Sequence, residues 1–428
     1  IQIIPPNLRQ CFIRLIKSNK NRKNDIVFPS FPKDNSVEIL IDLFFYCVKK
    51  ITGKDIKQKI WPDGKKYAFI LTHDVDSGWI YKEDNLRKFL DVERKMDIQG
   101  AWFFVAVTSC TVTMFLALAA LGIKEGDEVI VPSYSFIATA NVVVHIGAKP
   151  VFVDIDPRTY NINPGRIEEK ITEKTKAILP VHQAGMPACM DEINRIAEKH
   201  NLFVIEDAAC ALGSVYKGRR IGYSKNLVCF SFHPRKIITT GEGGAMVSLD
   251  GKYEDILRKL RHQGMSVSDL ARHSAKSVIF EEYPVIGYNF RMTDIQAAIG
   301  IVQMSKLDEI VRKRREIAER YNIFFKKLEY VEVPFVPEGI ETTYQSYILR
   351  IKENSPISRN DIMEKLLERG ISTRRGIMAI HREKPYRKMY ERFDLPETEK
   401  AVDSTIIIPV SYTHLRAHET SLHLVCRL

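Results

Sequence analysis

The stretch Val204-Ile205-Glu206-Asp207 decides the fold, because its apolar residues indicate a β-strand that delivers a carboxylate at its C-terminal end. In an open α/β sheet, ligand sites form where strands end in this way. A later motif, Phe230-Ser231-Phe232-His233-Pro234-Arg235-Lys236, brings an amine. A strand-end aspartate is more often a helix cap, and a lysine after an arginine is more often solvated. The two residues therefore become informative only as parts of an ordered set.

Around this stretch, short β-branched runs alternate with amphipathic helical stretches, a pattern typical of βαβ units and a mainly parallel sheet. The expected strands are Glu128–Pro132, Lys149–Asp154, Ala177–Val181 and Leu202–Glu206, and Met190–His200 is an expected helix between the last two. A helical region over residues 293–328 and a helix over Arg359–Arg369 indicate a smaller α+β domain. We therefore expect an α/β fold followed by a small C-terminal domain.

The turn Ser109-Cys110-Thr111 precedes a helix that we expect to begin near Val112. Small hydroxyl residues at a helix N-terminus make an anion site, because free N–H groups and the helix dipole both favour phosphate. Together with Asp207 and Lys236, this turn suggests pyridoxal 5'-phosphate (PLP) as the cofactor. Lys236 would bond covalently to the cofactor aldehyde, and Asp207 would keep the pyridine nitrogen protonated, which makes the ring an electron sink.

Residues 107–410 resemble the DegT/DnrJ/StrS family of PLP-dependent nucleotide-sugar aminotransferases. The resemblance rests on motifs that include VIEDAAC (204–210), SFHPRK (231–236), GYNFRM (287–292) and STRRGIMAIH (372–381). It implies the fold type I architecture, in which helices cover both faces of a mainly parallel, seven-stranded sheet and a smaller α+β domain follows. We expect the PLP-binding large domain over residues 107–310 and the small domain over residues 311–410.

The matched motifs imply roles for individual residues. Lys236 matches the lysine that holds the cofactor and shuttles a proton, and Asp207 matches the partner of the pyridine nitrogen, so these two are the expected catalytic residues. Phe136 matches an aromatic side chain stacked on the cofactor ring, with a core phenylalanine as the alternative. The expected cofactor-binding residues are Ser109, Cys110, Thr111, Phe136, Asp207, Cys210, Ser231, His233, Lys236 and Asn289.

Some positions depart from the family pattern or allow two interpretations. Cys210 stands where many members carry glutamine, which weakens any side-chain hydrogen bond to the cofactor's phenolic oxygen, and Cys110 stands where many carry glycine. His182 and His233 lie in matching motifs, but a packed, hydrogen-bonded histidine is as common as a catalytic one. Asn289 resembles a residue that reaches the phosphate site of a neighbouring subunit, which implies a homodimer; the alternative is a turn asparagine.

The substrate class follows from the resemblance. Family members transfer an amino group, usually from glutamate, to a keto sugar linked to a nucleoside diphosphate. The SFHPRK and STRRGIMAIH variants are most similar to 4-aminotransferases of the perosamine-synthase kind, which implies a 4-keto-6-deoxy sugar. Relatives that dehydrate the sugar replace the lysine with histidine, so Lys236 favours transamination. The candidate substrate residues are His182, Arg374, Arg375 and His381, with a solvated basic loop as the alternative for the arginines.

Composition limits the other classes of function. The chain has 428 residues, of which 45% are hydrophobic and 27% charged, and this is a globular profile. The net charge is +11, but no Lys/Arg run is interleaved with aromatic residues, so we expect an acidic small molecule and no nucleic acid. The seven cysteines include no C-x-x-C pair, which indicates a reduced, cytoplasmic protein. The longest apolar run, Val112–Ile123, is too short to span a membrane.

The two ends of the chain differ from its centre. LTHDVDS (71–77) resembles the first motif of NodB-type polysaccharide deacetylases and would supply Asp74 and Asp76 as carboxylates. That family also needs a downstream histidine pair, and His73 is the one histidine in residues 1–106, so we expect no metal site and favour a strand–turn cap. Residues 411–428 resemble a translated sequencing adapter.

We therefore expect a composite chain, with a truncated deacetylase-like fragment over residues 1–106 and an artefactual tail over residues 411–428. The absence of an initial Met fits this expectation. Two rival functions follow from the same residues: a metal-dependent polysaccharide deacetylase, and a PLP-binding regulator without catalysis. The presence of both Asp207 and Lys236 counts against the regulator.

Overall fold

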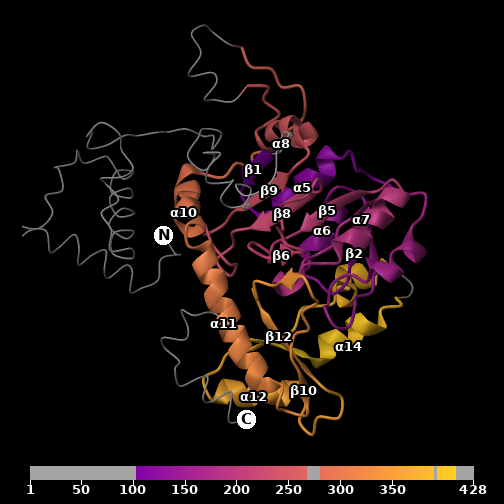
Figure 1. Ribbon diagram of the computed structural model, residues 1–428. Coiled ribbons are helices and arrows are strands. Elements are labelled where there is room, and N and C mark those ends of the chain that lie inside the picture. The colour runs from indigo at the N-terminus through magenta and orange to yellow at the C-terminus, as the bar shows by residue number, and fades with distance from the viewer. Residues whose placement is uncertain (1–102, 268–279, 390–392, 411–428) are drawn as a thin grey trace, which may run out of the picture. The chain divides into compact units, whose positions relative to one another are not determined.

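The computed structural model describes residues 103–267, 280–389 and 393–410 (Figure 1). The chain divides into two units, Ile1–Leu71 and Thr72–Leu428, and every described residue belongs to the second unit. The predictions for Asp74, Asp76 and residues 411–428 lie outside the described residues.

A seven-stranded sheet forms the centre of the described unit. In spatial order its strands are β1 (Phe103–Val107), β9 (Gly244–Ser248), β8 (Leu227–Ser231), β5 (Phe203–Asp207), β4 (Thr175–Ile178), β2 (Glu128–Pro132) and β3 (Lys149–Val153). The strands from β8 to β3 pair in parallel, and β9 runs antiparallel to both of its neighbours. The predicted mainly parallel sheet is therefore confirmed.

Helices cover both faces of this sheet. Successive strand residues point to opposite faces, so Val105 packs into one apolar cluster and Phe104 into another. The first face carries α5 (Cys110–Ala120), α6 (Ala138–His145) and α8 (Glu254–Arg261). The other face carries α7 (Met190–Lys199), α10 (Asp294–Met304) and the start of α11 (Leu307–Phe325). All residues of β2 and β8 are buried, as expected for strands covered on both sides.

Strand β1 corrects one sequence expectation. The run Ala101–Val105 was assigned to the deacetylase-like fragment, yet Phe103–Val107 pairs with the whole of β9 in the main sheet. All five residues of β1 are buried, and they contribute to the cores on both sides of the sheet. The strand therefore crosses the domain boundary predicted between residues 106 and 107, because its burial depends on β9, which is distant in sequence.

A second, four-stranded sheet forms after α11. Its order is β10 (Val331–Glu332), β12 (Tyr347–Ile351), β14 (Thr405–Ile408) and β13 (Arg374–Arg375), and all its pairs are antiparallel. Beside it lie α12 (Arg359–Glu368) and α14 (Pro396–Ser404), whereas α13 (Lys384–Arg387) packs through Tyr386 against the core of the main sheet. A three-stranded sheet of β11 (Ile340–Glu341), β6 (Val215–Tyr216) and β7 (Arg219–Arg220) joins this region to the centre of the chain.

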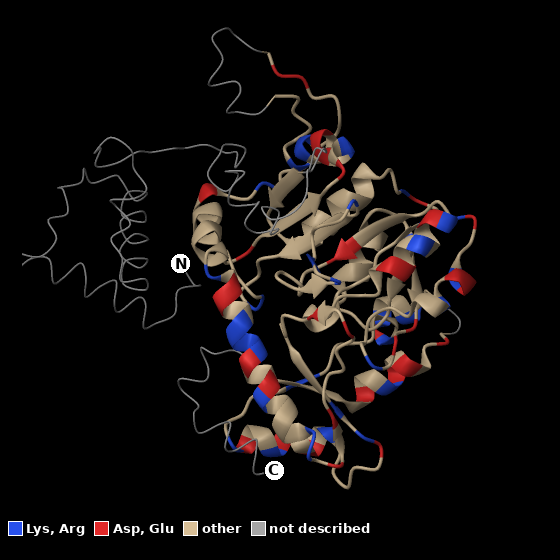
Figure 2. Cartoon of the chain, viewed as in Figure 1, with Lys and Arg blue, Asp and Glu red and all other residues tan. Residues whose placement is uncertain are grey.

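The predicted helical region over residues 293–328 consists of two helices, because α10 ends at Met304 and α11 begins at Leu307. Figure 2 marks many positions of charged residues along α11, whereas α10 is almost entirely uncharged. On α11, Lys313 pairs with Glu309 and Arg312 with Glu316, one helical turn apart. The charged face of α11 is therefore solvated, while α10 exposes apolar side chains such as Ile295. Within the described ranges, no helix combines the length and apolarity that a membrane crossing needs.

Candidate active site

Asp207 is the last residue of β5, at the carboxyl edge of the main sheet, as predicted. Its side chain is 5% exposed. One carboxylate oxygen, Oδ2, accepts a hydrogen bond from Thr139 Oγ1 at 2.9 Å, and Oδ1 accepts one from the Ala209 N–H at 3.1 Å. The carboxylate is thus buried and held from two sides.

Lys236 lies in the turn that follows β8, and its amine points to Cys210. The Nζ–Sγ distance is 3.3 Å. Burial acts to lower the pKa of Lys236, but Cys210 and Asp207 together outweigh it, so the pKa is raised above its ordinary value. Lys236, Cys210 and Asp207 are therefore close enough to interact electrostatically, and the structure brings together the two predicted catalytic residues.

The predicted phosphate turn lies beside the beginning of β9. Ser109 caps α5: its backbone is extended and its Oγ accepts a hydrogen bond from the Val112 N–H at 3.3 Å. Ser231, at the end of β8, pairs with Gly244, the first residue of β9. A Cβ atom on Gly244 would lie 2.4 Å from the Ser109 carbonyl carbon and 2.6 Å from the Cys110 nitrogen. Glycine at position 244 therefore lets the start of α5 lie close to Ser231. The backbone N–H groups at the start of α5 are then available to an anion.

Cys110 and Thr111 contribute to this turn in different ways. The Cys110 side chain is buried, and its thiol donates to the Cys229 carbonyl at 3.5 Å. Burial, with smaller effects of Asp207 and Cys229, raises the pKa of Cys110 well above its ordinary value. The thiol therefore belongs to the core, which leaves the backbone of Cys110 for the predicted role in anion binding. Thr111 is half-buried in the first turn of α5.

Phe136 lies between β2 and α6 and is 64% exposed, whereas Tyr134, two residues earlier, is fully buried. The alternative of a core phenylalanine is therefore wrong. An exposed ring at the edge of the site is what stacking on a planar cofactor requires. His233, in the turn before Lys236, lies with its Nε2 3.7 Å from Glu242 and accepts a hydrogen bond from the Arg235 N–H.

His182 does not have the geometry of a substrate ligand. It is fully buried, its Nδ1 accepts a hydrogen bond from the Ala188 N–H at 3.0 Å, and its Nε2 donates to Glu206 at 3.0 Å. Burial acts to raise the pKa of Glu206, but the bonds from His182 and Asn226 outweigh it and hold the pKa below its ordinary value. Both ring nitrogens are occupied, so the predicted substrate role of His182 is corrected to a packing role.

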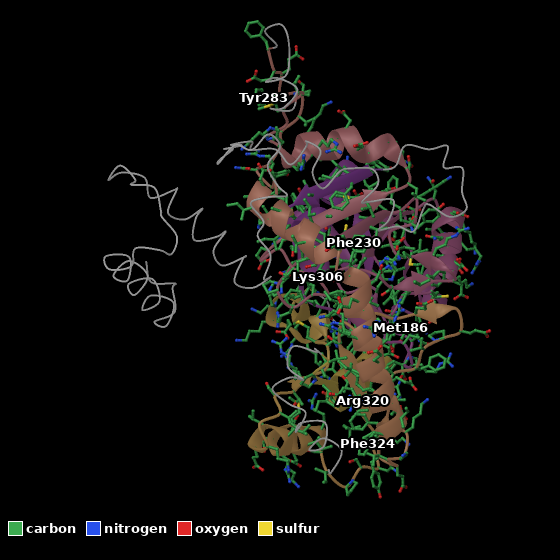
Figure 3. The ribbon with its side chains drawn as sticks, turned by 60° about the vertical axis from the view of Figure 1, so that its left-hand side comes forward. Met186, Phe230, Tyr283, Lys306, Arg320 and Phe324 are labelled. Carbon is green, nitrogen blue, oxygen red and sulfur yellow. The ribbon has the colours of Figure 1, made fainter. Side chains whose placement is uncertain are left out.

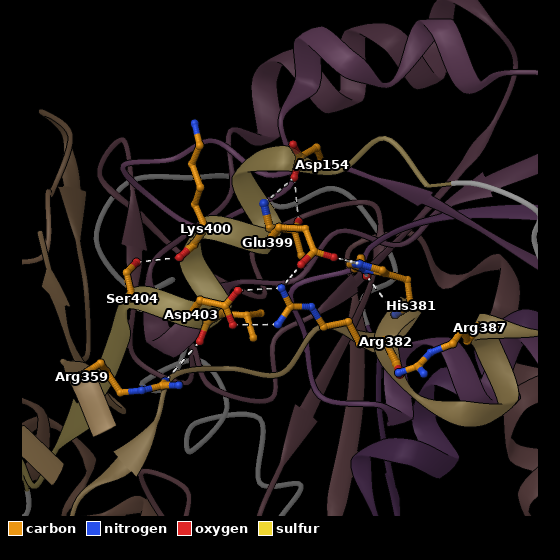
Figure 4. Close-up of polar contacts among 12 residues, drawn as sticks. Asp154, Arg359, His381, Arg382, Arg387, Glu399, Lys400, Asp403 and Ser404 are labelled. Atoms are coloured by element: carbon orange, nitrogen blue, oxygen red, sulfur yellow. Dashed lines mark hydrogen bonds and ion pairs between the residues drawn. The ribbon is translucent and has the colours of Figure 1, made fainter. Parts of the chain in front are cut away.

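His381 is also a packed histidine. Its Nδ1 lies 2.7 Å from Ser133 Oγ, and its Nε2 contacts Glu399, which also pairs with Arg382 (Figure 4). Burial, followed by the charge of Arg382, lowers the pKa of His381 to about 4. The ring therefore links β2 to α14 as a neutral group, and the predicted substrate role is corrected here too.

The remaining candidates are exposed. Arg374 and Arg375 form β13, an edge strand, and both are exposed. The next residue, Gly376, packs against Tyr134 and Thr405, which places this strand near the segment that carries Phe136. Asn289 is exposed, and its backbone bridges to that of His262.

Three site residues were missed in the sequence. Thr139 bonds to Asp207, Thr343 Oγ1 donates to the Cys210 carbonyl at 3.0 Å, and Gln345 Nε2 donates to the Arg235 carbonyl at 2.9 Å. The last two come from the segment that precedes β12. This segment fixes the backbone next to Lys236 and its thiol neighbour, and no local pattern could have indicated it.

These residues fit PLP. Asp207 would bind the ring nitrogen, Lys236 the aldehyde carbon, and the Ser109–Thr111 turn with Ser231 the phosphate, while the close approach at Gly244 forms the cradle. Among the residues that the structure describes, no three His, Cys, Asp or Glu side chains gather as a metal site.

An α/β fold of this topology, with a lysine and a strand-end carboxylate in one buried site, defines a PLP-dependent transferase of fold type I. The chain belongs to the DegT/DnrJ/EryC1/StrS aminotransferase family, which it matches over residues 66–421. This range includes parts of the two ends of the chain, residues 1–106 and 411–428. Their predicted resemblances, to a polysaccharide deacetylase and to a translated sequencing adapter, stay predictions. The family consists of PLP-dependent sugar aminotransferases, enzymes that transfer nitrogenous groups.

Individual relatives agree with this assignment. Protein MJ1066 of Methanocaldococcus jannaschii is 43% identical over 340 residues, which cover 78% of this chain and 87% of that protein. The spore coat polysaccharide biosynthesis protein SpsC of Bacillus subtilis is 37% identical over 352 residues, covering 81% and 90%. The crystal structure of DesI, determined in the presence of its TDP-sugar product, has a TM-score of 0.67 at 29% identity and covers 80% of this chain and 85% of that one.

Proposed function

We propose that the chain transfers an amino group from glutamate to a 4-keto-6-deoxy sugar linked to a nucleoside diphosphate, as perosamine synthases do. The observation that carries this proposal is the presence of Lys236 and Asp207 in one buried site of a sugar aminotransferase fold. The TDP-sugar product of DesI supports a nucleotide sugar, and the name of SpsC supports a role in polysaccharide biosynthesis. The reduced cysteine set predicted from the sequence supports a cytoplasmic location.

Each site residue has a defined task in this proposal. When bound, PLP supplies an electron sink for charge that develops at the substrate carbon. With the cofactor bound, the Lys236 amine would carry a proton between the amino-bearing carbon of the substrate and the cofactor. Asp207 holds the ring nitrogen, Phe136 covers the ring, and the N–H groups of the Ser109–Thr111 turn with Ser231 hold the phosphate.

We assign the sugar-nucleotide diphosphate to Arg374 and Arg375. Both are exposed on an edge strand, and guanidinium groups suit phosphate oxygens because they donate in a planar fork. We also propose residues 107–310, joined by β1, as the cofactor-binding domain and residues 311–410 as the small domain; the separate seven-stranded and four-stranded sheets support this division.

We also propose that two copies of the chain form a homodimer. The segment before α10 exposes Phe280, Tyr283 and Ile286, and α10 exposes Ile295 and Val302. Figure 3 shows Tyr283 on a segment that extends beyond the neighbouring helices. Asn289 lies between these two groups and is exposed, so a second copy packed here would receive Asn289 at its phosphate site.

The test is amino transfer by the PLP-loaded chain to a panel of 4-keto and 3-keto nucleotide sugars, with glutamate as donor. We expect the aminated sugar to form from a 4-keto substrate, and we expect a Lys236→Ala variant to form none. Amination of 3-keto sugars alone would contradict the proposed position, and no amination of any sugar by protein that binds PLP covalently would contradict the proposed activity.

A further inference from the structure

We propose that Thr139 is a positioning residue that orients the Asp207 carboxylate toward the cofactor ring. This inference rests on the proposed role of Asp207 as the partner of the pyridine nitrogen. It gives a role to a residue that the sequence analysis left without one.

Thr139 reaches Asp207 from a different part of the sheet. It is the second residue of α6, which follows β2, whereas Asp207 ends β5, and β4 lies between these strands. Its hydroxyl donates to Asp207 Oδ2 at 2.9 Å, and its side chain is 1% exposed. Water therefore has no access to replace this hydrogen bond without a change in packing.

The hydrogen bond from Thr139 to Asp207 also fixes the direction of a second hydrogen bond, between Thr139 and Ser135. A hydroxyl group has one hydrogen, and that of Thr139 is donated to Asp207. The hydrogen bond between Thr139 Oγ1 and Ser135 Oγ, at 2.9 Å, must then be donated by Ser135. Ser135 is buried as well, so Ser135, Thr139 and Asp207 form one directed chain of hydrogen bonds.

The two carboxylate oxygens are held by different elements. Oδ1 accepts from the Ala209 N–H at 3.1 Å, and Oδ2 accepts from Thr139. Two anchors fix the carboxylate plane, whereas the Ala209 bond alone allows rotation about the Cβ–Cγ bond. The hydrogen bond from Thr139 therefore determines the orientation of the Asp207 carboxylate relative to the ring nitrogen of the cofactor.

The experiment compares Thr139→Val, which removes the hydroxyl at constant shape, with Thr139→Ser, which keeps it. The readouts are the PLP dissociation constant, the pH dependence of the bound cofactor's visible absorbance, and kcat and KM for the sugar. Thr139→Val removes a hydrogen bond to a charged group. We therefore expect it to raise the PLP dissociation constant or to lower kcat about tenfold, with KM unchanged. We expect Thr139→Ser to restore most of the loss.

A matched control separates positioning from stability. Thr398 is another buried threonine whose hydroxyl donates to an aspartate, Asp154, at 2.7 Å, at the start of α14. Thr398→Val should lower the melting temperature as much as Thr139→Val does, but leave the cofactor absorbance and its pH dependence unchanged.

A double variant shows whether Thr139 acts through Asp207. If it does, Thr139→Val adds no further loss of PLP affinity on an Asp207→Asn background. An additive loss, or a Thr139→Val variant with wild-type cofactor properties beside an impaired Asp207→Asn variant, would overturn the role of Thr139 alone. An Asp207→Asn variant that binds PLP like the wild type would overturn the role of Asp207 and, with it, this inference.

Discussion

The Lys236 amine contacts the Cys210 thiol at the centre of the candidate site, with 3.3 Å between Nζ and Sγ. The thiol and Asp207 raise the pKa of Lys236 above its ordinary value although burial acts against them. Only a neutral amine adds to an aldehyde, and the raised pKa lowers the fraction of neutral Lys236 at neutral pH. Cys210 thus lowers the reactivity of the Lys236 amine until the cofactor replaces this contact.

This restraint predicts the effect of Cys210→Ala. Removing the thiol lowers the pKa of Lys236, which increases the fraction of neutral amine at neutral pH. For each half unit that the pKa falls, covalent loading with PLP should become about threefold faster near pH 7, and the difference should disappear only once the pH lies above the pKa of the wild-type lysine. Stopped-flow absorbance after mixing cofactor-free protein with PLP, across a pH series, measures these rates.

Cys189→Ala is the matched control, because Cys189 is exposed and contacts Glu192 outside the site. It should leave the loading rate unchanged. Equal rates for Cys210→Ala and the wild type at every pH would show that the thiol does not restrain Lys236.

The sequence predicted the positions of some site residues but not of others. Lys236 and Asp207 follow from motifs in which a strand end and a turn specify the position, and both lie where they were predicted. Thr139 and Thr343 meet their partners across 68 and 133 residues, so no local pattern signals them. The sequence could not decide between a substrate role and a packed role for His182, and it did not indicate that His381 is buried. The burial of a histidine depends on distant partners, here Glu206 and Ser133, and a motif does not encode these contacts.

At the scale of elements, the start of α5, the end of β8 and the start of β9 depend on one another through Gly244. A methyl group at this position would overlap the backbone of Ser109 and Cys110, since the distances to their atoms are 2.4 and 2.6 Å. Neither the strand nor the helix can shift easily, because both are buried in the core.

Gly244→Ala should therefore destabilise the fold by about 1–3 kcal/mol and weaken PLP binding, because it separates Ser231 from the helix start. Thermal melting and PLP titration measure the two effects. Gly165→Ala, in an exposed turn where the nearest contact of an added Cβ is 3.3 Å, is the control and should change neither. A Gly244→Ala variant with normal PLP affinity would show that this close approach does not form the phosphate cradle.

Long elements could be predicted from the sequence, and short ones could not. The strands β2, β3, β4 and β5 and the helix α7 follow from buried β-branched runs and helical spacing, and they match within a few residues. The two-residue strands β6, β7, β10, β11 and β13 carry no such signal, because their pairing is decided by partners far along the chain. The break between α10 and α11 was missed for a related reason, since helical spacing continues across it.

At the scale of the whole molecule, α10 and the segment before it expose large apolar side chains, whereas α11, which follows, carries many charged residues (Figure 2). Ile286 is 91% exposed and Ile295 58% exposed. Such a group of exposed apolar side chains is typical of a surface that another protein covers, and in the proposed homodimer that protein is a second copy of the chain.

The double variant Ile286→Asp/Ile295→Asp should therefore be monomeric and should bind PLP more weakly, because each site loses Asn289 of the second copy. Sedimentation velocity and PLP titration measure the two changes. Ile323→Asp is the control, because Ile323 is 57% exposed but lies on the charged helix α11. A wild-type chain that is monomeric, or a monomeric variant with unchanged PLP affinity, would contradict the proposed sharing of sites.

The fold class was predictable as a whole because the resemblance covers the entire main sheet except β1, and the family match over residues 66–421 agrees with it. The place of β1 was not predictable, since an apolar strand pairs equally well with any sheet until its partner is known. Its partner, β9, begins at Gly244, more than a hundred residues later.

The account depends above all on Lys236 as the residue that bonds covalently to PLP. The most direct measurement is borohydride reduction of the PLP-loaded chain, followed by proteolysis and mass spectrometry of the labelled peptide. The account predicts a phosphopyridoxyl group on Lys236 and none after a Lys236→Ala substitution. A label on any other lysine, or covalent PLP retained by the Lys236→Ala variant, would contradict it.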